Sequence, residues 1–594
     1  MVKVVDVFAN GTNKVSEVKN EMKIKSITIH NFRSLKDAML DLYDYNVLVG
    51  ANNVGKSNVL TALRIFYENE KYNEKFDFPK FQTDDNESWI EIEYSLEDDE
   101  FPNLKNEYKS LNNILKVRKY LKSEDKNKVK NNQSNIYGYE NGHLSENLFY
   151  GAKNISEAKL GSVIYIPELS TTDETLKLTG PSPLRDVITF VMKKVVKTSE
   201  SFDKLNTAFE EFNSKFKEES SKDGFSLGKM MEEINDSLKE WEVEFNFNIN
   251  PIRHEDIIKN LVSHYVVDKN LEERIDVKCL GQGLQRHLIY TLLKLSSQYT
   301  EKKTYEKKEF LPELNLILFD EPEAFLHPAQ QEFLNTSLKS LSSEEGQQVI
   351  IATHSPIFIS KNIEDIPALI KLKRDKGITQ IFQVSKDKQR KIIEQNNELV
   401  QMLKNKLVEK SIDQAMENSI KNIMGSTEDD ERMEQEAIRY LLWLDSERCS
   451  AFFADIVLIC EGATEKTFID YLIKNKWNDI RKKRIYVLDA MGKFNIHRYM
   501  NLFRELGIYH SVLADKDENK NAHEFINQFI EKQKNEFTKS IDFFDKDIES
   551  FLGIPQSTRR DRKPLNVMWH YINNEIDEKK VDELKEKITK LIGE

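Results

Sequence analysis

The chain has 594 residues and a formal net charge of −13, and its 31% charged and 39% hydrophobic residues are ordinary for a soluble protein of several domains. This acidic balance argues against a surface that is basic throughout, so any contact with nucleic acid must be local. The three cysteines are odd in number and far apart, which argues against a disulfide framework and a zinc site. No apolar run approaches the ~18 residues that span a bilayer, and residues 1–21 lack a signal-peptide core, so we expect a cytoplasmic protein without a membrane partner.

The first motif in the chain lies at residues 47–57, VLVGANNVGKS, where an apolar strand runs into a glycine-bounded loop and then a helix. This pattern predicts a P-loop, because Gly50 and Gly55 let backbone N–H groups face a phosphate at the positive helix N-terminus. We expect Lys56 to contact the β- and γ-phosphates and Ser57 to hold Mg²⁺. The predicted nucleotide contacts in this segment are Gly50, Asn53, Gly55, Lys56, Ser57 and Asn58.

A second glycine-rich turn opens a helix at residues 280–286, LGQGLQR. It stands where the signature sequence of an ATPase head should lie, and its helix N-terminus can cap the ATP of a partner subunit. The predicted contacts are Gly281, Gly283 and Gln285.

Two later strands end in polar side chains. Residues 314–323, LNLILFDEPE, predict a buried strand that delivers Asp320 and Glu321 at its C-terminal end, where ligands collect in parallel sheets. We expect Asp320 to hold the Mg²⁺ shell and Glu321 to orient or deprotonate the attacking water. Residues 349–355, VIIATHS, end another strand near His354, which would hydrogen-bond the γ-phosphate, although a lone histidine is more often structural.

In order and spacing these motifs resemble the head domain of ABC-type ATPases, in the branch that contains SMC-like and overcoming-lysogenization-defect (OLD) proteins. The resemblance implies that two heads sandwich ATP in a homodimer, with Gly283 reaching the nucleotide of the other chain. The family usually has serine in this signature, whereas this chain has Gln282. We therefore expect ATP binding rather than fast hydrolysis.

A chemically different cluster begins at residues 456–465, IVLICEGATE, where a hydrophobic strand ends at Glu461. We expect Thr464 to be the N-cap of the following helix and Glu465 to lie in its first turn. Both acids then face one junction between a strand and a helix.

The β-α-β-α-β rhythm continues through strands at residues 484–488 and 509–514, which favours a parallel sheet. Asp515 and Asp517 follow the last of these strands, and residues two apart in extended chain share a face. We expect both to point toward the edge where Glu461 emerges. Carboxylate oxygens of this kind suit Mg²⁺ or Mn²⁺.

This second cluster resembles a TOPRIM domain, with a glutamate after the first strand and then Asp-x-Asp, and Glu465 favours the nuclease branch. Residues 546–552, KDIESFL, and 559–564, RRDRKP, resemble the tail of the OLD TOPRIM domain, which implies Glu549 as a further metal ligand and Lys563 as a stabiliser of the scissile phosphate. Asp547 competes with Glu549, and Lys563 equally fits a DNA-backbone patch. The resemblance implies the catalytic set Glu461, Glu465, Asp515, Asp517 and Lys563, and metal ligands Glu461, Glu465, Asp515, Asp517 and Glu549, with Ser57 and Asp320 for the metal of the nucleotide.

The predicted fold class is α/β, with an ABC/SMC-like ATPase head that carries a helical insertion and a C-terminal TOPRIM domain. Residues 201–241 place apolar side chains at helical spacing, and the resemblance implies a dimerisation arm, although plain core packing fits equally. Residues 116–130 form a basic, Asn-rich stretch, read either as a solvated loop or as a mobile phosphate-binding loop. The expected parts are an extension at 1–22, the ATPase at 23–394 with its insertion at about 180–265, a helical linker at 395–450 and the TOPRIM domain at 451–594.

The hypothesis that follows is an ATP-binding, nucleotide-regulated, Mg²⁺- or Mn²⁺-dependent DNA endonuclease that assembles as a homodimer or larger homo-oligomer. Within the OLD family, Gabija-type and retron-associated nucleases work in antiphage defence, which implies a second component such as a helicase or a retron RNA/DNA. The alternative is an ATP-switched DNA-binding or scaffolding protein whose TOPRIM acids are catalytically silent. A topoisomerase or a primase is a weaker option, because neither a gate domain nor a zinc ribbon is visible.

Overall fold

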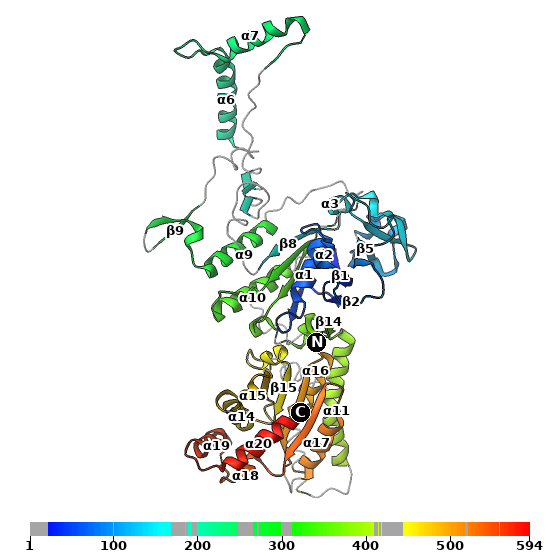
Figure 1. The fold of residues 1–594 in the computed structure, drawn as a ribbon, viewed down its shortest axis with the longest axis vertical. Coiled ribbons are helices and arrows are strands. Elements are labelled where there is room, and N and C mark those ends of the chain that lie inside the picture. The colour runs from blue at the N-terminus through cyan, green and yellow to red at the C-terminus, as the bar shows by residue number, and fades with distance from the viewer. Residues whose placement is uncertain are drawn as a thin grey trace. The chain divides into compact units, whose positions relative to one another are not determined.

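The computed structural model describes two compact units, residues 1–168 with 307–594 and residues 169–306, and each is treated by itself. The described residues are 22–98, 100–167, 184–185, 188–189, 191–192, 199–241, 243–246, 265–269, 272–298, 310, 312, 314–360, 362–408, 414, 417–418, 444–516, 521–557 and 559–593. The helical insertion predicted at about 180–265 falls inside the second unit. Figure 1 labels some of the elements of each unit.

The ATPase part of the first unit contains a six-stranded sheet in the order β14-β13-β3-β12-β11-β8. Its strands are β3 (Tyr45–Val49), β8 (Ser162–Ile166), β11 (Asn315–Asp320), β12 (Gln347–Ala352), β13 (Leu369–Asp375) and β14 (Ile378–Gln383). All neighbouring pairs are parallel except β13 with β14. Strand β12 is buried along its whole length, as expected for a parallel strand covered on both faces. The order therefore brings the C-terminal ends of β3, β12 and β11 to one edge.

A second sheet of the ATPase part is antiparallel, in the order β2-β1-β4-β5-β6-β7. Its strands are β1 (Lys23–Phe32), β2 (Leu35–Asp41), β4 (Ser88–Ser95), β5 (Ile114–Lys122), β6 (Ile136–Glu140) and β7 (His143–Leu148). One face buries side chains such as Ile27, Ile90 and Val117 in the same core as α1 (Lys56–Phe66).

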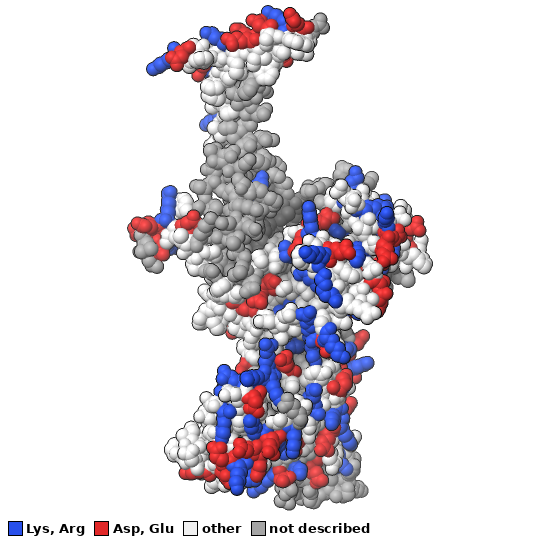
Figure 2. Space-filling model, viewed as in Figure 1, with Lys and Arg blue, Asp and Glu red and all other residues white. Residues whose placement is uncertain are grey.

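The prediction of a loop at residues 116–130 is wrong for its first part, because Lys116–Lys122 belong to β5. The strand alternation buries Lys119, whose Nζ donates to Phe66 O at 3.1 Å, and leaves Arg118 stacked on Trp89 and paired with Glu91 at 2.7 Å. Basic and acidic side chains are intermixed over this region of the surface (Figure 2). Acidic partners are therefore already present for Lys116, Arg118, Lys119, Lys122 and Lys128.

The C-terminal part of the first unit is a parallel sheet in the order β16-β15-β17-β18, as the β-α-β-α-β rhythm predicts. Its strands are β15 (Ile456–Cys460), β16 (Ile485–Asp489), β17 (Tyr509–Asp515) and β18 (Thr538–Phe544). Its helices are α14 (Ala463–Asn475), α15 (Asn478–Arg481), α16 (Lys493–Glu505), α17 (Asn521–Lys532), α18 (Ile548–Leu552), α19 (Lys563–Ile572) and α20 (Glu578–Leu591). Buried residues of β15, α14 and α20, among them Leu458, Phe468 and Leu584, form one core.

Two described segments lie between the ATPase sheets and the TOPRIM sheet in the sequence, and most of residues 409–443 of the predicted linker lie outside the described residues. Helix α11 (Lys386–Val408) lies against α16, where Asn501 Nδ2 donates to Asn396 Oδ1 at 3.0 Å and His497 Nε2 lies 3.2 Å from Asn396 O. The short 3-10 segment η10 (Arg448–Phe453) leads directly into β15. The helical character predicted for the linker is therefore present in α11, which begins before residue 395.

The second unit contains α6 (Glu200–Glu218), α7 (Leu227–Leu238), the short strands β9 (Val266–Asp268) and β10 (Glu273–Ile275), and α9 (Gln282–Gln298). The helices predicted at residues 201–241 are confirmed, with Ser199 and Ser226 as their N-caps. The Phe212 ring contacts those of Phe209 and Phe216 on α6, yet Phe212 is 48% exposed. This unit therefore carries apolar side chains that its own described residues leave open.

Further elements are the helix α10 (Pro328–Ser342) and the single turns α2 (Glu74–Asp77) and α3 (Ile155–Ala158), with 3-10 turns at Pro356–Phe358 and Ile363–Ala368. Within the described ranges, no helix is both long and apolar enough to cross a membrane. No disulfide joins Cys279, Cys449 and Cys460, as their spacing predicts.

Candidate functional sites

The P-loop follows β3 and turns through backbone conformations that require glycine. Gly50 has φ 150° and Gly55 has φ 106°. A Cβ on Gly50 would lie 2.4 Å from Leu372 O, and one on Gly55 would lie 2.5 Å from Thr379 Oγ1. Asn53 also has a positive φ, 62°, which asparagine tolerates. The loop is therefore folded back closely on β13 and β14, with α1 starting at Lys56 as predicted.

The side chain of Lys56 is buried and lies along this loop. Its Nζ donates to Gly50 O at 3.0 Å and to Ala51 O at 3.1 Å, and it lies 2.7 Å from His354 Nε2. Burial lowers the pKa of Lys56 to about 8, although nearby carboxylates, Glu321 first among them, act in the opposite direction. The loop thus holds a cation whose charge is sensitive to its surroundings.

His354 follows β12 and faces Lys56. Burial, together with the charge of Lys56, lowers the pKa of His354 to about 4. The imidazole is therefore neutral near pH 7, and its Nε2 accepts the hydrogen bond from Lys56. His354 Nε2 also lies 3.6 Å from Glu321 Oε1, but with a neutral ring this contact is not an ion pair at neutral pH.

Glu323 fixes the backbone that carries His354, a role that sequence reasoning missed. His354 N donates to Glu323 Oε1 at 2.5 Å and Thr353 Oγ1 donates to Glu323 Oε2 at 2.7 Å. The signal was present as the last acid of DEPE at residues 320–323. It joins the end of β12 to the loop after β11.

Ser57 and Asp320 come together as the P-loop reading requires. Ser57 Oγ donates to Asp320 Oδ1 at 3.4 Å, a geometry in which a hydroxyl and a carboxylate can share one Mg²⁺. Glu321 has φ 46°, an uncommon conformation for a residue with a side chain, and its N–H donates to Ala352 O at 2.8 Å. Backbone strain therefore lies at the residue predicted to act on water.

Asn58 is turned toward the protein. Its Nδ2 donates to Ser34 Oγ at 2.8 Å and its Oδ1 lies 3.4 Å from Arg33 Nη1. The side chain thus ties α1 to the turn between β1 and β2, so its contact with nucleotide stays a prediction.

The signature segment lies in the second unit. Gly281 directly precedes α9, Gly283 lies in the first turn, and Gln285 Nε2 donates to Leu280 O at 2.7 Å. A Cβ on Gly281 would meet no described atom within 4 Å. The side chain of Gln282 is outside the described residues, and contact of this turn with a second chain stays a prediction.

At the C-terminal edge of the TOPRIM sheet, Glu461 and Asp515 meet. Glu461 Oε2 accepts a hydrogen bond from Asp515 N at 3.2 Å, and Glu461 N donates to Leu513 O at 3.2 Å. Asp515 is buried, and Glu461 keeps 22% of its side chain exposed. The Glu461 carboxylate therefore reaches the backbone of Asp515 at this edge, and joint action of the two carboxylates stays a prediction.

Lys493 also lies at this edge, and sequence reasoning gave it no role. Its Nζ donates to Asp515 O and lies 3.7 Å from Glu461 Oε2, with 1% of the side chain exposed. The signal was a Gly-Lys pair, residues 492–493, directly after a strand and at the start of a helix. The same pattern at Gly55-Lys56 was recognised only because the P-loop motif is known.

Glu465 lies in the first turn of α14, as expected, but the N-cap is Gly462 and not Thr464. The expectation for Thr464 is wrong because the helix already begins at Ala463 and the Glu465 carboxylate satisfies the exposed end, accepting from Gly462 N at 3.1 Å. Burial raises the pKa of Glu465 to about 7, and repulsion from the Glu461 and Glu549 carboxylates adds to this shift. Glu461 and Glu549 are thus both near enough to influence the carboxyl group of Glu465.

Glu549 and Asp547 have different environments. Asp547 is the N-cap of α18, accepting from Ser550 N at 2.8 Å, and it also accepts from Gln556. Glu549 is buried, and its Oε1 accepts no hydrogen bond from the described residues. The nearest cation is Lys563 Nζ at 3.9 Å. Burial raises the pKa of Glu549 while Lys563 lowers it.

Asp489 is a further acid at this edge to which sequence reasoning gave no role. It ends β16, the strand next to β15, and its Oδ1 accepts from Met491 N at 2.7 Å. Arg448 Nε donates to Asp489 O at 3.1 Å, which links the start of η10 to this strand end. The signal was an acid immediately after the predicted strand at residues 484–488.

The fit of this edge to a divalent metal rests on its oxygen donors. Glu461, Asp515 and Glu549 offer hard carboxylate oxygens, and a buried oxygen without a hydrogen bond on Glu549 is the kind of atom that a cation would satisfy. Within the described parts of the chain, however, no group of three His, Cys, Asp or Glu side chains is arranged so that it could hold one metal ion. Asp517 is outside those parts.

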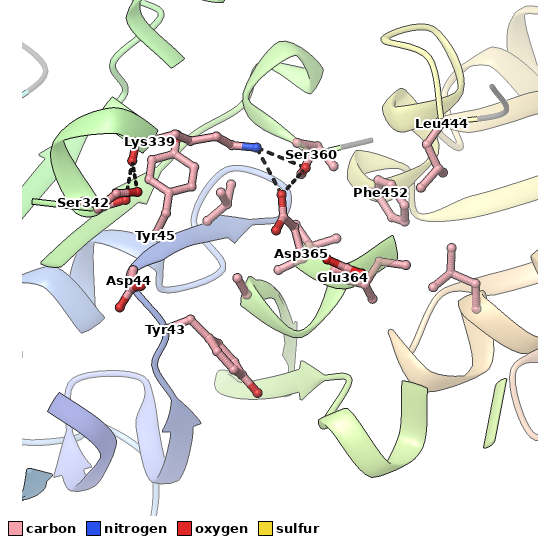
Figure 3. A pocket seen from close by; sticks show the side chains of 17 residues that line it. Tyr43, Asp44, Tyr45, Lys339, Ser342, Ser360, Glu364, Asp365, Leu444 and Phe452 are labelled. Atoms are coloured by element: carbon pink, nitrogen blue, oxygen red, sulfur yellow. Dashed lines mark hydrogen bonds and ion pairs between the residues drawn. The ribbon is translucent and has the colours of Figure 1, made fainter. Parts of the chain in front are cut away.

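A cavity of about 290 Å³ lies elsewhere in the first unit, near Tyr45 at the start of β3 (Figure 3). Leu444, Phe452 and Leu502 from the TOPRIM side complete its lining. Its polar groups bond to one another, since Lys339 Nζ donates to Ser360 Oγ at 3.0 Å and pairs with Asp365 at 3.2 Å. Because the P-loop follows the other end of β3, this cavity is not the nucleotide site.

Comparison with known families matches both the ATPase part and the TOPRIM part of the chain. The model of an AAA ATPase domain matches residues 22–359, and the model of an overcoming-lysogenization-defect-protein-like TOPRIM domain matches residues 452–517. The first match covers more than half of the chain.

Individual relatives are distant. The chain is similar to the Old nuclease of Escherichia phage P2, at 22% identity over 84% of this chain and 77% of that protein. It is also similar to the endonuclease GajA of Bacillus cereus strain HuB5-5, at 24% identity over 50% of this chain and 38% of that protein. Among solved structures, the SMC head domain from Thermotoga maritima matches 61% of this chain and 99% of its own length, with 13% identity and a TM-score of 0.29.

Proposed function

Because the chain belongs to the OLD family, in which an AAA ATPase domain is followed by an OLD-like TOPRIM domain, we propose that it is a nucleotide-regulated, metal-dependent DNA endonuclease. The relatives named above are called nucleases or endonucleases. The observation that carries the proposal is the contact of the Glu461 carboxylate with Asp515 N at the carboxyl ends of β15 and β17. Glu465 lies near enough for both Glu461 and Glu549 to raise its pKa. Carboxylates gathered at such a strand edge are suited to hydrolysis of a phosphodiester.

In the proposed reaction, the residues at this edge bind metal ions or stabilise the phosphate. Glu461, Glu465, Asp515, Asp517 and Glu549 would hold one or two Mg²⁺ or Mn²⁺ ions, which activate water and stabilise the leaving oxygen when bound. Lys563, partly exposed beside Glu549, offers a positive charge to a phosphate that approaches this edge. The raised pKa of Glu465 keeps part of its population protonated in the absence of an added cation, which limits repulsion among the acids.

Regulation by ATP is proposed to pass through η10. Lys371 of β13, the strand beside β3, donates to Phe452 O, and the Phe453 ring lies 6.4 Å from the His354 ring. At the other end of η10, Arg448 holds the end of β16 through Asp489 O. A shift of His354 on nucleotide binding would therefore act on a segment that reaches the acidic edge.

Self-association is proposed through the second unit and the ATPase head. Leu205, Phe212 and Phe216 of α6 are 44%, 48% and 40% exposed, and apolar side chains of this size are normally covered. The proposed substrate is DNA, in keeping with the similarity to an endonuclease. The proposal includes a role in antiphage defence with a second component, a helicase or a retron RNA/DNA, as the family resemblance implies.

The proposal is tested by cleavage of supercoiled plasmid with Mg²⁺ or Mn²⁺, with and without ATP. Wild type is compared with Glu461→Gln, Lys56→Ala and the surface control Lys474→Ala, whose partner Asp470 lies on the same helix. We expect loss of cleavage in Glu461→Gln, loss of the ATP response in Lys56→Ala, and no change in the control. Equal cleavage by wild type and Glu461→Gln would contradict the proposal.

The second candidate is an ATP-switched DNA-binding or scaffolding protein with a silent TOPRIM module. One observation favours it, namely that no three described acids stand together as a complete metal set. ATP-dependent DNA binding by wild type without cleavage under any metal condition would support this alternative.

A further inference from the structure

We propose that Lys493 is a positioning residue of the TOPRIM site, which holds Glu461 and Asp515 in their relative positions and balances their charge before a divalent cation binds. This inference rests on the proposed function, because it concerns the same acidic edge. It goes beyond it by assigning a role to a cation inside the site.

The backbone brings Lys493 to this place from a third strand. Gly492, with φ 111°, turns the chain after β16, and Lys493 is the first residue of α16. In the sheet order β16-β15-β17, its Nζ reaches past β15 to donate to Asp515 O at the end of β17. One side chain therefore links all three strand ends that surround the site.

The contact with Glu461 explains how a charged lysine side chain can be buried at this position. Lys493 Nζ lies 3.7 Å from Glu461 Oε2, the same oxygen that accepts from Asp515 N at 3.2 Å. A fully buried ammonium is unfavourable unless it is paired and hydrogen-bonded, and these two groups supply both conditions. Glu461 is thereby held at one oxygen while 22% of its side chain remains exposed toward the site opening.

Burial also separates Lys493 from the lysines that could touch substrate. With 1% of its side chain exposed, Lys493 has no surface to offer a DNA phosphate, whereas Lys563 is 35% exposed. Its effect on the reaction must therefore act through Glu461 and Asp515, as a positioning effect rather than a direct contact.

Two variants separate the effect of the Lys493 charge from the effect of its hydrogen bond. Lys493→Met removes both the charge and the donor, and Lys493→Gln keeps a donor for Asp515 O without charge. We expect metal-free melting temperatures that fall by about 5 °C for Lys493→Met and less for Lys493→Gln. Addition of Glu461→Gln to Lys493→Met should restore most of the loss, because no partly buried carboxylate is then left without its counter-charge.

Metal binding gives a second readout that does not require catalysis. Titration with Mn²⁺, followed by electron paramagnetic resonance, should show affinity reduced about 10- to 100-fold in Lys493→Met, with ATP binding unchanged. Lys474→Met serves as the matched control, because Lys474 is an exposed lysine that pairs with Asp470 on its own helix.

Three results would overturn the proposal. They are unchanged melting and Mn²⁺ affinity in both Lys493 variants, equal melting losses of Lys493→Met with and without Glu461→Gln, and a loss of melting temperature with normal Mn²⁺ affinity. Failure of wild type to cleave DNA would contradict the proposed nuclease function, while the coupling of residues 493 and 461 in melting would still decide the positioning role.

Discussion

The Nζ of Lys56 lies 2.7 Å from Nε2 of His354, so the cation predicted to grip phosphate is held by the residue predicted to sense it. Both groups are shifted by burial, with the pKa of Lys56 near 8 and that of His354 near 4. An ammonium donating to a neutral imidazole is the arrangement that these values imply near neutral pH. We expect the pair to separate when Lys56 turns to the phosphate oxygens of a bound nucleotide, which would free the imidazole to move.

The first prediction concerns the pH dependence of ATP binding. A base with a lowered pKa is charged only below that value, so Lys56 loses its charge as pH rises through about 8, where an unshifted lysine would stay charged. We expect ATP affinity in the presence of Mg²⁺ to fall about 10-fold between pH 7 and 9.5. Equilibrium dialysis across this range checks it. A flat profile to pH 9.5 would contradict the shifted pKa.

The second prediction concerns stability of the metal-free protein. The folded-state pKa of Glu465 is raised to about 7, so the folded state binds its proton more tightly than the unfolded state does. The resulting stability is present below the unfolded value and is lost as pH rises toward about 7. We expect Glu465 to make the melting temperature of wild type higher at pH 5 than at pH 8. The variant Glu465→Gln should lack this part of the pH dependence. Scanning calorimetry in the presence of a chelator makes the comparison.

The same carboxylate offers an internal check with metal. A bound cation favours the ionised form of Glu465, so saturating Mg²⁺ should raise the melting temperature of wild type more at pH 8 than at pH 5. The variant Glu465→Gln should show a smaller difference between the two pH values. An equal metal effect at both pH values would argue against Glu465 as a ligand.

The third prediction separates Glu549 from Asp547. Asp547→Ala removes the N-cap of α18 and should destabilise the protein by about 1 kcal/mol while Mn²⁺ binding persists. Glu549→Gln should leave the melting temperature near that of wild type or above it, because a buried carboxylate is replaced, yet weaken Mn²⁺ binding at least about 10-fold. Thermal melting and Mn²⁺ titration of both variants test this. The reverse pattern would assign the metal to Asp547.

Much of this architecture was predictable because its signals are local in sequence. The P-loop at Gly50 to Ser57, the strand end at Asp320 and the parallel β-α-β rhythm after residue 455 all depend on short patterns of glycine, acid and apolar residues. Family resemblance then linked the two halves. Patterns of this kind specify backbone and thus the edge where ligands meet.

The parts that escaped prediction depend on contacts between distant segments. Nothing near Lys493 in the sequence indicates that its side chain reaches Asp515, two strands away in the sheet. Asp547 and Glu549 are two residues apart and chemically similar, and only the start of α18 makes one a cap and buries the other. The basic stretch at 116–130 looked like a loop because the acids that pair with Lys116 and Arg118 lie on β4.

The fourth prediction addresses η10 as the link between nucleotide and nuclease. Phe453→Ala removes the ring beside His354, and Arg448→Ala releases the end of β16. We expect both variants to bind ATP as wild type does and to lose most of the difference in cleavage with and without ATP. Arg390→Ala, an exposed residue of α11 paired only at 3.9 Å with Asp387, is the control. An intact ATP response in both variants would exclude η10 as the route.

The fifth prediction concerns self-association through α6. Leu205, Phe212 and Phe216 lie seven and four residues apart, so they share one helix face, and all three are at least 40% exposed. Coverage of this face by a second copy would bury apolar area that the described residues of one chain leave in water. We expect the double variant Phe212→Glu and Phe216→Glu to lower the molecular mass in solution, measured by light scattering during size-exclusion chromatography. Glu210→Lys on the same helix provides a control for charge alone. An unchanged mass together with a lowered melting temperature would instead mean that these rings pack inside their own chain.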